Sequence, residues 1–148
     1  MIAVDTNLLV YSHREDSPFH LAAKPLIDSL RYGAADWAIP LHCIHEFIGI
    51  VTHPRIYARP TPLAIAFTTI EIWGAGQNLR LLGETEAYLP TLREVAVSAQ
   101  RVGPQIHDAR VAAACLYHGV RELWTADRDF SLFPQLKTRN PLVATEAD

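Results

Sequence analysis

The sequence predicts an α/β fold in which helices cover both faces of a mainly parallel sheet of short strands. Short apolar segments alternate along the chain with longer segments whose apolar residues recur at helical spacing. The short segments are mostly apolar throughout, which is typical of parallel strands buried on both faces. The chain has 148 residues, 49% of them hydrophobic and 20% charged, which suits one domain with its own core. We therefore expect residues 1–148 to form a single domain.

The first half of the chain supplies two of the predicted strands and four of the helices. Pro62 suits the first turn of the last of these helices, and Gly74 ends it. We expect Phe67 and Trp73 of that helix to lie in the core. In order, the elements are a strand at 2–4, a helix beginning within 8–12, a helix at 19–30, a strand at 37–39, and helices at 41–51 and 63–73.

The second half continues the alternation. Pro90 makes a break or a new start within a weakly amphipathic helical segment, and Gly119 closes an alanine-rich helix. In order, the elements are a strand at 79–82, the helical segment at 84–101, a helix at 108–118, a strand at 122–125, a polar turn at 127–129 and a last strand at 142–145.

The charge balance is mildly acidic. The 16 acidic and 13 basic residues give a net charge of −3, which is not the basic balance of a protein that holds nucleic acid by charge alone. Carboxylates gathered around a divalent cation would bias the count in this direction, and the cation would supply the missing positive charge. The balance is therefore compatible with a nucleic-acid enzyme that uses a metal ion.

Cysteine usage and the amino terminus indicate a cytoplasmic protein. Cys43 and Cys115 stand far apart without metal-type spacing, so we expect two buried, reduced thiols. No apolar run approaches the roughly 18 residues that a membrane span needs. The amino terminus lacks a basic region ahead of an apolar core, so neither a secretory signal nor a membrane anchor is expected.

Acidic residues recur where ligand sites form in such folds. Asp5 follows the first predicted strand, and Asp127 and Asp129 follow the strand at 122–125. Asp108 begins the alanine-rich helix, and Glu46 lies within the otherwise apolar helix "LHCIHEFIGIV". Ligands in open α/β sheets bind beyond the carboxyl ends of the strands, and a charge in an apolar helix is costly unless it is paired or bound. We expect these acids to converge on one site.

Each acid also has a structural interpretation, which the sequence leaves open. Asp5 and Asp108 suit helix N-caps or first-turn acids, Asp127 and Asp129 suit a turn, and Glu46 suits a helix rim or a pair with an arginine. Their coincidence in one α/β pattern favours a metal site. Convergent carboxylates repel one another, and Mg²⁺ or Mn²⁺ would relieve that conflict and support phosphodiester hydrolysis.

Four stretches of the sequence resemble PIN-domain ribonucleases, and among these the VapC toxins of type II toxin–antitoxin pairs. They are "AVDTNLLVY", "HEFIGIVTHPRIY", "HDARVAAACLYHGV" and "LWTADRDFSLFPQLKTRNPL", in the family order and over nearly the whole chain. The resemblance implies a three-layer α/β/α sandwich and a Mg²⁺- or Mn²⁺-dependent endoribonuclease that acts on structured or messenger RNA. It also implies products with a 5′-phosphate and a 3′-hydroxyl, a homodimer, and neutralisation by a cognate VapB-type antitoxin.

The resemblance assigns roles to the acids. It makes Asp5, Glu46, Asp108 and Asp127 the catalytic and metal-binding set. Asp129 matches an additional acid of some members and ranks lower as a ligand. By this resemblance Asp5, Asp108 and Asp127 hold the ion, while Glu46 completes the site or orients the attacking water.

Further residues match supporting positions. Thr6, Asn7 and Thr125 match polar residues that orient the carboxylates through hydrogen bonds. Arg55 and Arg128 are the better candidates for contacts with RNA phosphates.

Two alternatives stay open, and a third fails on its motif. A catalytically silent module would bind RNA or protein without turnover, and chelator-sensitive cleavage would separate the two. A phosphatase that uses a strand-end aspartate needs a second aspartate two residues after Asp5, where this chain has Asn7. A zinc protease needs His-Glu-x-x-His, but counting from His45 the fifth position is Gly49.

Overall fold

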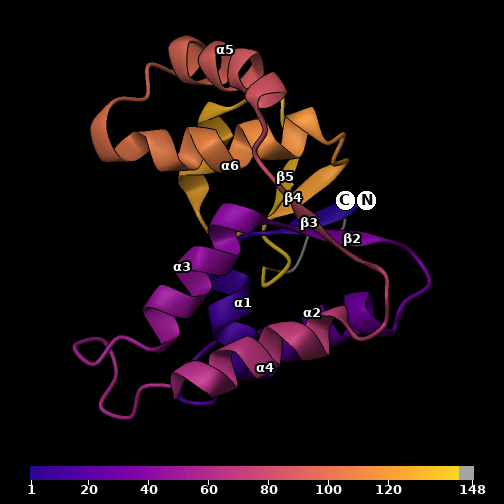
Figure 1. The fold of residues 1–148 in the computed structure, drawn as a ribbon, viewed down its shortest axis with the longest axis vertical. Helices are drawn as coiled ribbons and strands as arrows, with labels where there is room; N and C mark the ends of the chain where they lie inside the picture. The colour runs from indigo at the N-terminus through magenta and orange to yellow at the C-terminus, as the bar shows by residue number, and fades with distance from the viewer. Residues whose placement is uncertain (144–148) are drawn as a thin grey trace.

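The centre of the fold is a five-stranded sheet in the order β3-β2-β1-β4-β5, and every neighbouring pair is parallel (Figure 1). The structure is a computed structural model and describes residues 1–143. The strands are β1 (Ile2–Val4), β2 (Trp37–Pro40), β3 (Leu79–Leu82), β4 (Glu122–Trp124) and β5 (Thr138–Arg139).

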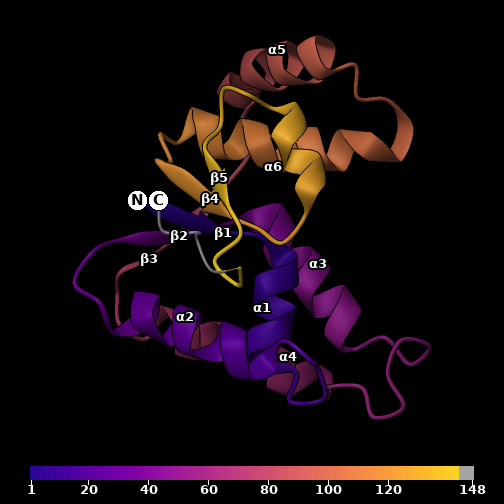
Figure 2. The ribbon, with the colours of Figure 1, turned by 180° about the vertical axis from the view of Figure 1, so that it is seen from behind.

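Helices form a layer on each side of this sheet, so the expected three-layer α/β/α sandwich is confirmed. In Figure 1 α5 and α6 lie above the sheet and α2 and α4 below it, and Figure 2 shows the same layers from behind. α3 starts directly after β2 and contacts α1, α4 and α6. The helices are α1 (Thr6–His13), α2 (His20–Tyr32), α3 (Leu41–Val51), α4 (Leu63–Gly74), α5 (Leu89–Ala99) and α6 (Ile106–Tyr117), with 3₁₀ turns η1 (Glu86–Tyr88), η2 (Gly103–Gln105) and η3 (Arg128–Leu132).

None of the described helices is long and apolar enough to cross a membrane.

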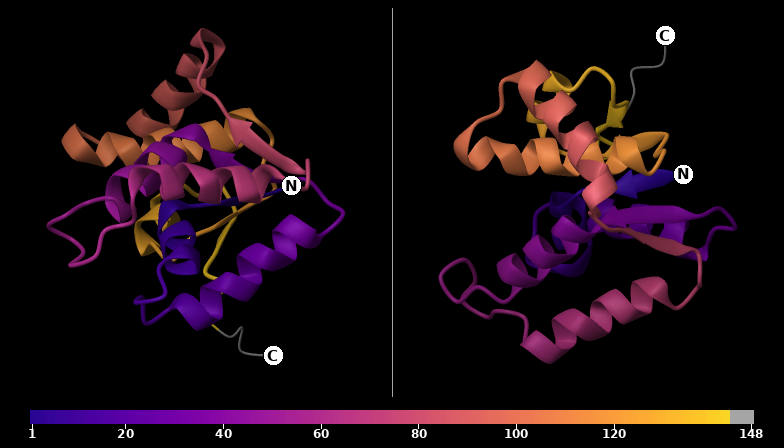
Figure 3. Two further views of the ribbon diagram at one scale, coloured as in Figure 1. Left: turned by 60° about the horizontal axis from the view of Figure 1, so that its bottom comes forward. Right: turned by 45° about the horizontal axis from the view of Figure 1, so that its top comes forward.

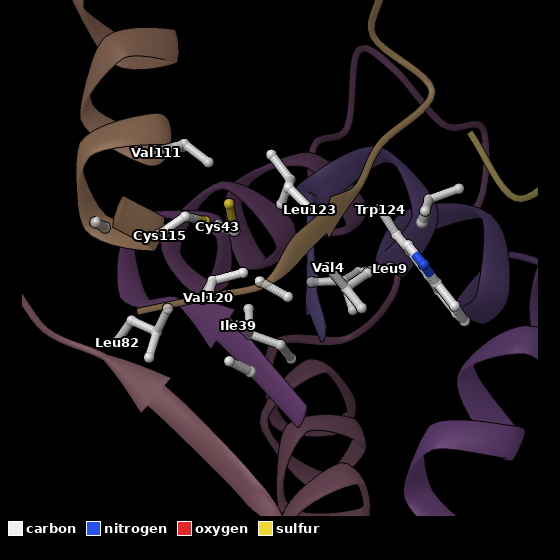
Figure 4. Close-up of a cluster of buried hydrophobic side chains, with 14 of the residues drawn as sticks. Val4, Leu9, Ile39, Cys43, Leu82, Val111, Cys115, Val120, Leu123 and Trp124 are labelled. Carbon is white, nitrogen blue, oxygen red and sulfur yellow. The ribbon is translucent and has the colours of Figure 1, made fainter. Parts of the chain in front are cut away.

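The core forms where the helices meet the inner strands. Val4, Ile39 and Leu123 of three neighbouring strands are fully buried, and Figure 4 shows them packed together. Cys43 of α3 and Cys115 of α6 are buried in the same cluster, and both are free thiols, as expected. Because the strands are short, each contributes few side chains, and helix residues complete the packing.

Helix α4 buries less than its composition suggested. Trp73 is 5% exposed and packs against Phe47, as expected for a core residue. Phe67 is 49% exposed, so its expected place in the core was wrong. α4 is rich in apolar residues but lies on the outside of its layer, so one side contacts α3 and the other faces solvent. Further exposed apolar residues of α4 are Leu63, Ile65 and Ile72.

The last strand is the clearest error of the sequence prediction. β5 lies at Thr138–Arg139, not at 142–145. Leu142 and Val143 lie in a turn and a bend, and the remaining two positions lie outside the described residues. β5 is an edge strand that pairs through its backbone with β4, so it needs no apolar pattern of its own.

The other elements differ from their expected bounds by a few residues at the ends. The segment at 84–101 divides into η1 and α5, and Pro90 lies in the first turn of α5, so it marks a new start. The polar turn after β4 continues into the 3₁₀ helix η3.

The order of the strands changes direction at β1 and β4. From β1 the chain adds β2 and β3 on one side, and β4 and β5 then lie on the other side (Figure 3). The Asp5 amide donates to the Trp124 carbonyl at 2.9 Å, which joins the carboxyl ends of β1 and β4. Such a change of direction is where open α/β sheets bind ligands.

Candidate functional site

Asp5 directly follows β1 at this change of direction. It is only 6% exposed, and it caps α1 by accepting from the Thr6 amide at 2.8 Å. The Cys43 thiol lies 3.5 Å from the same carboxylate oxygen, Oδ1. Oδ2 accepts from the Thr125 hydroxyl at 2.8 Å and from the Asn7 amide at 3.4 Å. The capping interpretation is therefore correct, and the other oxygen of the same carboxylate binds Thr125, which follows β4.

Thr125 and Asn7 tie Asp5 to the segment after β4. The Thr125 hydroxyl donates to Asp5 and accepts from the Asp127 amide at 3.0 Å. Asn7 Oδ1 accepts from the Ala126 amide at 3.2 Å. The Thr125 hydroxyl thus bonds both to the Asp5 carboxylate and to the backbone of Asp127. This fixes the position of these two residues, far apart in the chain, relative to each other.

Asp108, Asp127 and Asp129 form a close group of acids in the described part of the chain. Each offers one carboxylate oxygen, and these oxygens all lie within 4.8 Å of one another. Asp108 lies in the first turn of α6, and Asp127 caps η3 by accepting from the Asp129 amide at 2.9 Å. The turn interpretation of Asp127 is therefore also correct. This turn brings Asp129, which the sequence analysis ranked lowest as a ligand, into the group.

Glu46 approaches from α3. Its Oε1 accepts from the Thr6 hydroxyl at 2.9 Å and lies 3.4 Å from His42 Nε2. The side chain is 41% exposed. The Glu46 carboxylate is therefore not buried, although its helix is apolar. The hydrogen bond from the Thr6 hydroxyl of α1 orients this carboxylate.

The environment opposes ionisation of two of these acids. Burial raises the pKa of Asp5 to about 6, and the Glu46 carboxylate adds to the rise, while hydrogen bonds from Thr125 and Thr6 oppose it. Burial also raises the pKa of Asp108, and the charges of Asp127 and Asp129 add to that rise. A bound cation would favour the ionised form of these carboxylates and so oppose the rise in their pKa values.

The donor set suits a hard divalent cation. Carboxylate oxygens are the ligands that Mg²⁺ and Mn²⁺ prefer, and the three close oxygens come from separate residues that the fold has already positioned. Asp5 adds a buried carboxylate that is bonded to Thr125. The arrangement can hold such an ion beside a polyanionic substrate.

The two expected RNA contacts lie in different places. Arg128 lines a hollow of about 470 Å³ together with Thr125 and Asp127 of the site, and Arg139 lines it too. Arg55 lies in the exposed loop between α3 and α4, where its amide donates to His53, and it does not line that hollow.

Two neighbours of the acids had no role in the sequence prediction. Cys43 lies beside Asp5, and His42 beside Glu46. Both stand on α3 at helical spacings of three and four residues before Glu46, so this spacing was the available signal. The roles of the acids as ligands remain predictions.

Comparison with known proteins identifies the family. A model of the PIN domain matches residues 2–136. Ribonuclease VapC48 of Mycobacterium tuberculosis is 30% identical over 141 residues, which cover 93% of this chain and 94% of the relative. The structure of VapBC2 from Rickettsia felis, bound to a DNA fragment from their promoter, has a TM-score of 0.65 at 15% identity and covers 94% of this chain and 98% of that one. Mycobacterium tuberculosis VapC20, a Sarcin-Ricin loop cleaving toxin, has a TM-score of 0.66 at 18% identity and covers 88% and 93%. The chain therefore belongs to the PIN-domain family and, within it, to the VapC ribonucleases.

Proposed function

We propose that this chain is an endoribonuclease toxin that requires a divalent metal ion, Mg²⁺ or Mn²⁺. The observation that carries the proposal is the close group of carboxylates that Asp108 at the start of α6 forms with Asp127 and Asp129 after β4, in a member of this family. The relatives named as ribonucleases support RNA as the substrate. VapC20 is a Sarcin-Ricin loop cleaving toxin, which supports a structured RNA target here, while messenger RNA is the target class that the family resemblance also implies.

The ion would be held by Asp108, Asp127 and Asp129. Asp5 and Glu46 would be further acidic side chains around it. When bound, the ion would polarise a water molecule and offset the negative charge that develops on the phosphodiester. Asp5 is too buried to approach bulk solvent, so its contribution is a fixed negative charge that favours the cation. In this proposal Asp129 is a metal ligand, whereas the sequence analysis ranked it below the other acids.

The chain's own residues hold this arrangement in place. Thr125 orients Asp5 and the backbone of Asp127, and Asn7 joins the first acid to the segment after β4. Thr6 binds Oε1 of Glu46, and the second oxygen of that carboxylate is suited to accept a proton from the attacking water. Preorganised groups of this kind need no rearrangement when the phosphodiester reacts.

From the acids, the RNA backbone would continue along the hollow that Arg128 and Arg139 line. Both arginines are exposed, and among residues 1–143 neither forms an ion pair. Their guanidinium groups are therefore available for phosphates on either side of the cleaved bond. Arg55 lies outside this hollow and would contact a more distant part of the RNA.

The partners follow from the family. A VapB-type antitoxin would neutralise the chain, since VapBC2 of Rickettsia felis is such a pair. The exposed apolar side of α4 offers a surface for an antitoxin segment. We also propose that residues 1–148 form a single domain that acts as a homodimer in the cytoplasm, where RNA is accessible.

Cleavage of RNA by the purified chain tests the proposal. Candidate RNAs should be cut with Mg²⁺ or Mn²⁺ and left intact with EDTA, and Asp108→Asn should abolish cleavage while Asp36→Asn retains it. Asp36 lies just before β2, at the opposite end of the sheet, and pairs with Arg80. RNA binding without turnover would favour the silent module. The phosphatase alternative is not favoured, since Asn7 stands where its second acid would be.

A further inference from the structure

Two histidine rings stack at the contact between α3 and α6. His42 lies in the first turn of α3, and His107 directly precedes Asp108 on α6. Their ring centroids are 5.1 Å apart and the ring planes differ by 9°. The His42 side chain is 11% exposed, whereas His107 is exposed. The stack therefore has one buried ring and one at the surface.

The buried ring faces Glu46. His42 Nε2 lies 3.4 Å from Glu46 Oε1, one helical turn away, at the long limit for a hydrogen bond. Within the described part of the chain, this buried nitrogen has no hydrogen-bond partner. A buried ring nitrogen without a partner is unfavourable, and the carboxylate is the group that lies within reach. Thr6 binds the same oxygen from α1, so two elements converge on Oε1.

We propose that His42 and His107 are positioning residues of the ribonuclease reaction, which hold Glu46 of α3 in register with Asp108 of α6. The inference rests on the proposed function. His42 directs the Glu46 carboxylate through its Nε2 hydrogen, and the His107 ring keeps His42 in place. The stack thus links the helix that carries one acid to the helix that carries another.

This link matters because the two acids belong to separate helices. Thr125 already couples Asp5 to Asp127, but both of those residues follow strands of one sheet. Within residues 1–143, no hydroxyl group joins Glu46 to Asp108 in this way. A ring stack between these two helices fixes the distance between them.

Paired substitutions separate the hydrogen bond from the stacking. His42→Phe keeps a ring and removes the donor, whereas His42→Gln keeps an N–H donor and removes the ring. His107→Ala removes the stacking, and His107→Phe keeps it. Loss of a group that orients a metal-site residue typically lowers activity or metal affinity about 10- to 100-fold. We expect kcat to fall in that range in His42→Phe and about tenfold in His107→Ala, with KM for RNA unchanged. His42→Gln and His107→Phe should each recover part of the loss.

Two matched controls come from the same helices. His45→Ala removes an exposed imidazole of α3. His118→Ala removes a half-buried imidazole directly after α6, which bonds to the Gly83 carbonyl. Both should retain kcat. Urea unfolding of every variant identifies those that fold, and only these are compared.

Binding of Mn²⁺ without RNA, measured by calorimetry, gives a readout that is independent of turnover. Affinity should fall about tenfold in His42→Phe and in Glu46→Gln. A rise in KM with kcat unchanged would overturn the inference, because the rings would then contact RNA. Unchanged kcat and Mn²⁺ affinity in both His42→Phe and His107→Ala would overturn it too. If the wild type cleaves RNA and only Glu46→Gln is impaired, this inference fails while the proposed function stands; a wild type without cleavage refutes the function itself.

Discussion

Replacing Asp5 by asparagine should make the metal-free protein more stable at neutral pH while abolishing cleavage. The rise of the Asp5 pKa from 3.8 to about 6 corresponds to about 3 kcal/mol, at roughly 1.4 kcal/mol per pKa unit. The folded state binds the proton more tightly than the unfolded state does. The stability that this group contributes is therefore fully present below pH 3.8 and is lost as the pH rises through about 6.

Asparagine cannot ionise, so Asp5→Asn escapes this loss. Its amide group forfeits part of the hydrogen bonding that Asp5 accepts from Thr125 and Asn7, which costs about 1 kcal/mol for each bond at any pH. That cost cancels when two pH values are compared. Relative to the wild type, the variant should gain about 2 kcal/mol in free energy of unfolding between about pH 4 and pH 7.5.

Urea unfolding in EDTA at both pH values measures this gain. Asp36→Asn is the control, because its side chain is 48% exposed and its replacement should change stability little at either pH. Saturating Mn²⁺ should reduce the advantage of Asp5→Asn, because the ion stabilises only the protein that binds it well. An Asp5→Asn variant that is less stable than the wild type by the same amount at both pH values would refute the burial argument.

Three further predictions concern the site, the RNA and the fold. Thr125→Val should lower kcat about 10- to 100-fold with KM unchanged in steady-state cleavage, since one hydroxyl orients two acids; unchanged kcat would contradict this. Arg128→Ala and Arg139→Ala should each reduce the salt dependence of log Kd for a labelled single-stranded RNA by about 0.7, measured by anisotropy in EDTA, because each removes one phosphate contact. Arg121→Ala, at the amino end of β4, should leave the slope unchanged, and equal slopes in all three variants would refute the path through the hollow. Asn78→Ala should destabilise the chain by about 2 kcal/mol in urea, because the Asn78 amide donates to three backbone carbonyls before β2; a loss below about 0.5 kcal/mol would show that water replaces these bonds.

The sequence located the edge of the sheet that carries the site. Asp5 and Asp127 follow apolar strands, and the carboxyl ends of parallel strands meet at one edge, so their convergence was predictable. That β1 and β4 are direct neighbours was not predictable from pattern alone, because strand order depends on long-range packing. The hydroxyl of Thr125 shared by two acids follows from that neighbourhood.

Other features depended on where a helix lies in the fold. The apolar composition of α4 predicted a buried helix, but composition does not say which side finds a partner, and Phe67 faces solvent. β5 was missed because an edge strand pairs through backbone groups, and Thr138 and Arg139 carry no apolar pattern. The stack of His42 on His107 requires the crossing of α3 and α6, which no local spacing encodes.

The chemistry of the cleaved ends tests the metal-dependent ribonuclease most directly. A labelled RNA is incubated with the wild type and with Asp108→Asn, with Mg²⁺ or with EDTA, and both new ends are identified. We expect a 5′-phosphate and a 3′-hydroxyl from the wild type with Mg²⁺, and intact RNA in the other reactions. Cleavage in EDTA that leaves a 2′,3′-cyclic phosphate would contradict the proposal, because the RNA's own 2′-hydroxyl would then be the nucleophile and the acidic group would need no metal ion.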